Sequence, residues 1–173
     1  MKKNLILTVL FMAFAGIVYA EDAVYKPTYV EDWAKQGNVV ELFFMYHGYS
    51  SGIRYERKID DVISAGVSLN YNFAGDAPSY GARLECFFYP QAHTLSAWFV
   101  GPFAGAYNSN AEESGPVFFS LGAQGGYRWI FDYITVTPRA MVQYGLGGGA
   151  ARKIWNGAAG FIYGAGLSAG VAF

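Results

Sequence analysis

The chain has 173 residues, the length of one domain, and a formal net charge of −1. This charge does not favour nucleic acid, which binds strongly basic surfaces, and the single cysteine, Cys86, excludes an internal disulfide. Aromatic residues make up 18% of the chain and there are 22 glycines, a composition that favours a β-barrel over a helical membrane protein.

The first 20 residues have the pattern of a secretory signal peptide. Lys2 and Lys3 form a basic start, Leu5–Val18 is an apolar run, and Val18–Ala20 ends in the small residue of a cleavage site. An N-terminal transmembrane anchor is the alternative, but the run is short for a helical span. Cleavage removes two of the 12 basic residues and leaves ten against 13 acidic ones. We therefore predict a cleaved signal peptide (1–20) and export from the cytoplasm.

The segment that follows differs from the rest of the chain. Glu21–Gly37 is polar and contains Pro27, so we predict a periplasmic lead-in (21–37) ahead of the folded domain. Beyond the signal peptide, no apolar run reaches the 18 residues that a helical span requires.

From Asn38 onward, apolar side chains recur at every second position, the period of a β-strand. In Val62–Ala74 one face is entirely apolar and the other is small or polar, and Phe161–Phe173 alternates in the same way to the end of the chain. Leu95–Tyr107 is ambiguous, because both faces are apolar. The predicted strands are Val39–His47, Ile53–Ile59, Val62–Ala74, Tyr80–Tyr89, Leu95–Tyr107, Val117–Ile130, Ile134–Leu146 and Phe161–Phe173.

These strands predict an all-β fold, an eight-stranded antiparallel up-and-down transmembrane β-barrel over residues 38–173. With both ends in the periplasm, the outer loops are Gly48–Gly52, Gly75–Ser79, Asn108–Gly115 and Gly147–Gly157. A soluble barrel of the lipocalin type also alternates. Only 14% of the residues are charged, however, and the polar face is too small to be a water-facing surface. We therefore expect the apolar face to contact lipid.

Charged residues fall on the face that then lines the lumen. They are Glu41, Arg54, Glu56, Lys58, Arg83, Glu85, Arg128 and Arg139, with Gln124 and Gln143 on the same face. Buried charges are costly unless they are paired, and the interior of an eight-stranded barrel is just wide enough for side chains to fill. The sequence therefore predicts a salt-bridge network that plugs the lumen. A hydrated narrow pore lined by the same groups is the alternative.

Catalysis has weak support. His47 lies at the outer rim of the first strand, near Ser50, Ser51 and Asp76, and a His–Ser pair can form an activated nucleophile. Some outer-membrane barrels modify lipid A with such residues, so a lipid-modifying enzyme remains a third possibility. Serine is common in turns for other reasons, however, and no motif connects these residues. We expect no cofactor, no metal site and no catalytic residue.

Several motifs resemble a known family. They are Tyr55–Arg57 before a turn, Gly81–Glu85 with Phe88–Pro90, Phe99–Phe103, and Gly126–Phe131. Together they resemble a family of small bacterial outer-membrane β-barrels of unknown function with OmpA/OmpX-like architecture, over Val39–Phe173. The resemblance implies an eight-stranded barrel in the outer membrane and implies no activity. It also implies that the terminal Phe173 is a recognition signal for the outer-membrane assembly machinery.

The sequence thus predicts a non-enzymatic, integral outer-membrane barrel with a structural or surface-interaction role and a packed, charged lumen. Its expected partners are outer-membrane lipid, lipopolysaccharide and the assembly machinery, and we expect a monomer that binds no nucleic acid. A narrow channel for small solutes is the main alternative. No peptidoglycan-binding domain is expected after the barrel, because the sequence stops at the last strand.

Overall fold

The computed structural model describes residues 36–46, 50–73, 79–90, 95, 97–109, 117–146 and 161–173. The predicted signal peptide, residues 21–35 of the predicted lead-in, parts of the first three predicted outer loops and all of the fourth (Gly147–Gly157) lie outside these residues. The strands are β1 (Asn38–Tyr46), β2 (Ser50–Lys58), β3 (Ile63–Asn72), β4 (Ser79–Phe88), β5 (Trp98–Ser109), β6 (Val117–Tyr127), β7 (Trp129–Phe131), β8 (Ile134–Leu146) and β9 (Phe161–Ala172). Among the described residues, no helix is long and apolar enough to cross a membrane.

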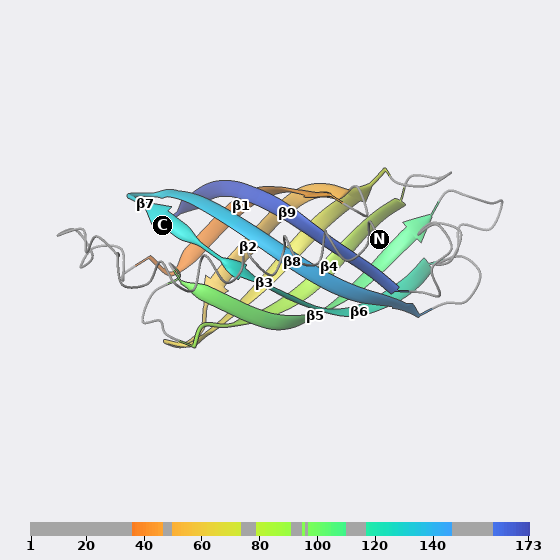
Figure 1. Ribbon diagram of the computed structural model, residues 1–173, viewed down its shortest axis with the longest axis horizontal. Coiled ribbons are helices and arrows are strands. Elements are labelled where there is room, and N and C mark those ends of the chain that lie inside the picture. Colours follow the sequence, from red (N-terminus) through yellow and green to blue (C-terminus); the bar gives the residue numbers. More distant parts are fainter. Residues whose placement is uncertain are drawn as a thin grey trace, which may run out of the picture. The chain divides into compact units, whose positions relative to one another are not determined.

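The strands form one closed antiparallel sheet (Figure 1). From β1 to β6 each strand pairs with the next along the chain, β6 and β7 both pair with β8, β8 pairs with β9, and β9 pairs with β1 to close the barrel. The backbone of Asn38 exchanges two hydrogen bonds of 2.9 Å with Phe173, so both lie at one end, which we call the terminal end. The opposite end, where β1 continues to β2 and β8 to β9, is the loop end.

Although nine strands are numbered, the barrel has eight positions around its wall. The reason is that β6 and β7 are one strand with a short interruption. Gly126 pairs with Arg139 and Trp129 pairs with Val136, so the register on β8 is the same on both sides of the break. Pro138, which cannot donate a backbone hydrogen bond, lies between these two partners on β8. The prediction of an eight-stranded antiparallel barrel is therefore confirmed.

The strands are staggered around the barrel. A line of paired residues that starts at Ala172 in β9 passes once through β1 to β6 and β8 and returns to β9 at Ile162, ten residues away. The line runs Ala172, Val39, Glu56, Gly66, Glu85, Phe103, Gly122, Gln143 and Ile162. Such a stagger makes the strands oblique to the barrel axis, typically by about 35–45°, and Figure 1 shows them running obliquely.

The two faces of the sheet have the polarity expected for a barrel in lipid. Large apolar side chains point outward and are exposed, such as Leu84 (70%), Leu42 (68%) and Tyr163 (68%), whereas Glu56 and Arg128 are fully buried. A soluble barrel would show the opposite arrangement. The predicted assignment of the apolar face to the exterior is therefore confirmed.

Inward aromatic rings lie over inward glycines on the neighbouring strand. In four cases the ring and the glycine are register partners, and a Cβ on the glycine would come within 3.0 Å of the ring. The pairs are Phe43 with Gly52, Tyr107 with Gly81, Phe103 with Gly122 and Phe99 with Gly126. Only glycine permits this close approach. The narrow lumen can therefore hold several aromatic rings.

These pairs explain where the predicted boundaries were wrong. Ser50–Gly52 belongs to β2 rather than to a turn, and Gly52 lies under the ring of Phe43. The ambiguous fifth strand begins at Trp98 rather than Leu95, and its inward face carries the rings of Phe99, Phe103 and Tyr107.

The turn between β7 and β8 is also shorter than predicted. Phe131 pairs with Ile134, which leaves a turn of only Asp132 and Tyr133. Asp132 has a φ of 55°, a left-handed conformation that aspartate tolerates better than most residues.

Candidate functional site

The candidate site is the set of charged side chains that strand alternation delivers to the lumen. Of the eight predicted lumen charges, seven are at most 7% exposed. Lys58 differs: it lies at the terminal end of β2, where its Nζ is 3.1 Å from an Asp61 carboxylate oxygen, and its side chain is partly exposed. We call six of the buried residues the charged layer: Glu41, Arg54, Glu56, Glu85, Arg128 and Arg139.

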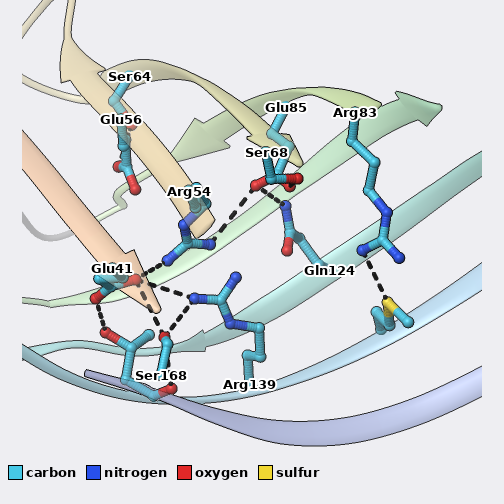
Figure 2. A network of polar contacts seen from close by, with 12 residues as sticks. Glu41, Arg54, Glu56, Ser64, Ser68, Arg83, Glu85, Gln124, Arg139 and Ser168 are labelled. Atoms are coloured by element: carbon cyan, nitrogen blue, oxygen red, sulfur yellow. Dashed lines mark hydrogen bonds and ion pairs between the residues drawn. The ribbon is translucent and has the colours of Figure 1, made fainter. Parts of the chain in front are cut away.

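Glu41 on β1 is the centre of this layer (Figure 2). Its carboxylate forms an ion pair with Arg54, and it lies 3.2 Å from Nε of Arg128 and 3.0 Å from Nη2 of Arg139. The hydroxyl groups of Thr137 and Ser168 also donate to it, at 2.6 and 3.1 Å. Side chains from β1, β2, β8, β9 and the β6–β7 break therefore meet at one carboxylate.

Glu56 lies nearer the terminal end. It accepts hydrogen bonds from Nη2 of Arg128 at 2.6 Å, from the hydroxyl of Ser64 at 2.5 Å and from the hydroxyl of Tyr89 at 2.5 Å. Nη1 of Arg128 donates to the same tyrosine oxygen at 2.9 Å. Arg128 thus joins the two carboxylates of Glu41 and Glu56.

Glu85 on β4 completes the layer. Nη1 of Arg54 lies 3.6 Å from its carboxylate, the Ser68 hydroxyl donates to it at 2.7 Å, and the amide nitrogen of Gln124 donates at 3.1 Å (Figure 2). Glu41 and Glu56 therefore each have at least three hydrogen-bond donors, and Glu85 has two donors and the ion pair with Arg54. Several partners of this kind are needed to offset the cost of removing carboxylates from water.

Two apolar layers enclose the charged layer along the barrel axis. The first lies at the terminal end and contains Val39, Phe87, Tyr89, Leu95, Ala97, Phe99, Ile130 and Ala172. The second lies on the loop side and contains Phe43, Met45, Phe103 and Met141. Val39 and Phe43 flank Glu41 at two residues on either side, which places one layer below the carboxylate and the other above it.

The apolar layers also contact the guanidinium groups directly. Cζ of Arg54 lies 5.1 Å from the centre of the Phe87 ring, and Cζ of Arg139 lies 5.8 Å from that of Phe43. Cations over aromatic faces are stabilised by the ring quadrupole. The apolar layers therefore cover the charges, and the faces of these two guanidinium groups lie against aromatic rings rather than against aliphatic side chains.

Sequence reasoning missed some members of the site and left others without a role. Tyr89, which bridges Glu56 and Arg128, was placed at a strand end with no function, although its odd position matches the inward face of β4. Thr137 and Ser168, which donate to Glu41, fall on the inward face by alternation, and nothing else in the sequence indicates their role. Gln143, named with the charges, is buried, but its carbonyl oxygen has no hydrogen-bond partner.

The catalytic alternative receives no further support. His47 and Asp76 lie outside the described residues. Ser50 lies in β2 rather than in a turn, and its side chain is buried and has no hydrogen-bond partner. Within the described part of the chain, no three His, Cys, Asp or Glu side chains cluster as metal ligands would.

Comparison with known proteins supports the fold. No family model and no curated protein matches the chain. The structure is similar to the N-terminal β-barrel domain of Pseudomonas aeruginosa OprF, with a TM-score of 0.58 and 15% identity over 80% of this chain and 98% of that domain. It is also similar to Neisserial surface protein A, with a TM-score of 0.48 and 11% identity over 79% of this chain and 94% of the other. The likeness to the OprF domain is one of fold, and it agrees with the OmpA/OmpX-like architecture expected from the sequence.

Proposed function

We propose that this chain is an integral outer-membrane β-barrel whose lumen is plugged and whose role is structural or surface-interacting rather than catalytic. The exposed apolar exterior supports insertion in lipid, because a water-facing surface of this composition would aggregate. The proposed partners are outer-membrane lipid and lipopolysaccharide around the barrel, and the proposed state is a monomer.

Aromatic side chains near the barrel ends support the same placement. Tyr46 and Tyr80 are exposed near the loop end, and Phe131, Tyr133 and Phe173 are exposed near the terminal end. Aromatic girdles at both interfaces are typical of barrels that span the outer membrane. In this placement the terminal end faces the periplasm and the loop end faces outward.

The main support for a plugged lumen is the order of the three layers along the barrel axis. A conducting path would have to cross the terminal apolar layer, the charged layer and the loop-side apolar layer in turn. An ion entering the charged layer would also have to displace one of the close pairs, such as Arg128 with Glu56 at 2.6 Å.

Conductance in planar bilayers tests this proposal. The refolded full-length protein is expected to insert without stable unitary current steps, with a porin as the positive control for insertion. The double variant Phe103→Ala, Met141→Ala opens the loop-side layer but leaves the terminal layer and the ion pairs, so it should also stay closed. Stable current steps from the unmodified protein would overturn the plug and favour the narrow channel.

Phe173 is proposed as part of the assembly signal, as the resemblance to outer-membrane barrels implies. Its side chain is 61% exposed, while its backbone pairs with Asn38 across the seam. Deleting Phe173 should lower the yield of protein in the outer membrane, measured on fractionated membranes. Phe131→Ala removes another exposed aromatic ring at the same end and serves as the control. An undiminished yield of the deletion variant would contradict the assignment.

A further inference from the structure

Arg83 is a buried guanidinium that does not belong to the charged layer. Its side chain projects from β4 on the loop side of Glu85, and Figure 2 shows it lying apart from the cluster around Glu41, with its guanidinium directed toward a sulfur atom, that of Met141. The residue is 4% exposed. Among the described residues, no carboxylate oxygen lies within 4.0 Å of it, whereas every other buried arginine has such a partner.

The close contacts that Arg83 makes with the described residues are to uncharged groups. Nε donates to the hydroxyl of Tyr107 at 2.5 Å, and Nη1 lies 3.5 Å from the sulfur of Met141. The guanidinium carbon lies 5.0 Å from the centre of the Phe103 ring and 5.8 Å from that of Tyr107. Nη2 is buried without a hydrogen-bond partner.

The buried charges of the lumen therefore do not balance. Four arginines and three glutamates are buried among the described residues, and all three glutamates are engaged by Arg54, Arg128 or Arg139. A guanidinium cannot neutralise itself by losing a proton at ordinary pH. A buried charge without compensation is strongly unfavourable. The positive charge of Arg83 thus calls for a negative partner.

Several of the buried polar groups that have no hydrogen-bond partner among the described residues lie on the same side of the lumen as Arg83. Arg83 pairs with Gly105, which pairs with Ser120, so the three residues form one row across β4, β5 and β6. A Cβ on Gly105 would lie 3.0 Å from the Ser120 hydroxyl and 3.1 Å from the Tyr107 hydroxyl, so both groups converge where Gly105 has no side chain. The Ser120 hydroxyl has no hydrogen-bond partner.

Two buried amides extend this polar region. Both amide atoms of Asn70 and the carbonyl oxygen of Gln143 lack hydrogen-bond partners, and both residues are 4% exposed. Asn70 pairs with Gly81 on one side of the row, and Gln143 pairs with Gly122 on the other. Polar side chains that are this deeply buried are nearly always hydrogen-bonded in folded proteins.

We propose that Arg83 and Ser120 form a binding site for a small oxyanion, a carboxylate or an inorganic phosphate, in the loop-side half of the lumen. Nη2 of Arg83 supplies the charge-assisted hydrogen bond and the Ser120 hydroxyl supplies a second donor. The amide of Asn70 offers a further donor for the bound group. In this proposal the anion enters from the loop end, past the side chains of the loop-side apolar layer, because the charged layer and the terminal apolar layer both lie on the other path.

Anion-dependent stability tests the site. The full-length protein is refolded in detergent micelles, and its thermal unfolding midpoint is measured against increasing sodium acetate or inorganic phosphate. Ionic strength is held constant with the sodium salt of a bulky sulfonate. A ligand that binds only the folded state raises the midpoint progressively with its concentration. We expect a saturable rise with at least one of the two anions and one site per chain.

Three variants assign the effect to residues. Arg83→Met should abolish the anion dependence, and Ser120→Ala, which keeps the guanidinium, should weaken the apparent affinity about tenfold. Arg57→Gln removes an exposed arginine near the other end of the barrel and should leave the dependence unchanged. The proposed site would be wrong if neither anion raised the unfolding midpoint of the unmodified protein. It would also be wrong if the Arg83→Met variant kept the full rise in the midpoint.

Discussion

The two halves of the lumen contain the same kinds of buried polar and charged residue, but these residues differ in how fully they are paired. Toward the terminal end, Glu41, Glu56 and Glu85 each have several donors, and apolar side chains cover the charges. Toward the loop end, Arg83 has no carboxylate and the Ser120 hydroxyl has no hydrogen-bond partner among the described residues. Burial alone therefore does not identify a functional group. We call the first the satisfied half because its carboxylates are paired, although Nε and Nη1 of Arg54 and Nε of Arg139 have no hydrogen-bond partner among the described residues. We expect this half to contribute stability and the loop-side half to be able to bind a ligand.

The largest expected effect is at the centre of the satisfied half. Glu41→Gln would place amide hydrogens against three guanidinium groups and leave those charges without their shared carboxylate. Removing one partner from a buried ion pair typically costs about 3–5 kcal/mol, and we expect at least that loss in the free energy of unfolding. Urea unfolding in lipid vesicles, followed by tryptophan fluorescence, measures it.

The control for Glu41→Gln is Asp61→Asn at the rim, where the pair with Lys58 is partly exposed. Exposed pairs contribute little to stability, so this variant should unfold like the unmodified protein. Equal losses for the two variants would show that the charged layer is no more important than a surface pair.

An intermediate effect is expected from two matched serines. Ser168 accepts a hydrogen bond from Arg139 at 2.6 Å and donates one to Glu41 at 3.1 Å. Because hydrogen bonds to charged groups contribute about 1.5–3 kcal/mol, Ser168→Ala should lower the free energy of unfolding by about that amount. Ser120→Ala, in buffer free of carboxylate and phosphate, should have almost no effect. A reversed order would contradict the contrast between the two halves.

The smallest effect is expected for Arg83→Met in the same buffer. An uncompensated buried charge is unfavourable, and Met replaces it by an apolar side chain of similar length, so the free energy of unfolding should stay the same or rise by about 1 kcal/mol. Arg54→Met is the comparison, since Arg54 pairs with Glu41 and Glu85 and its loss should be clearly destabilising. If Arg83→Met were equally destabilising, Arg83 would belong to the stabilising half.

The strands and the direction of each face were predictable from local alternation. Ser64, Ser68 and Ser168 fall on the inward face simply because every second residue does. Pairing across the barrel was not predictable in this way: Arg128 reaches Glu41 from 87 residues away, and Arg139 from 98. Which residues meet depends on the ten-residue stagger, a property of the closed sheet that no single strand contains.

Two segments whose boundaries were predicted wrongly share one cause. The fifth strand looked apolar on both faces because its inward rings are accommodated by glycines on its neighbours, such as Gly81 and Gly122. Ser50–Gly52 looked like a turn because small residues are common in turns. In both cases the decisive partner lies on another strand, so composition within the segment was misleading.

The pairing of β1 with β9 has a consequence for the order of events in folding. Asn38 and Phe173 are 135 residues apart and meet directly, and contacts between such distant positions form slowly because the intervening chain must first be brought together. Glu41, in the first strand, receives donors from Ser168 in the last. The hub of the charged layer therefore completes its set of partners only when the barrel closes, which makes closure a cooperative, late step rather than the gradual addition of hairpins.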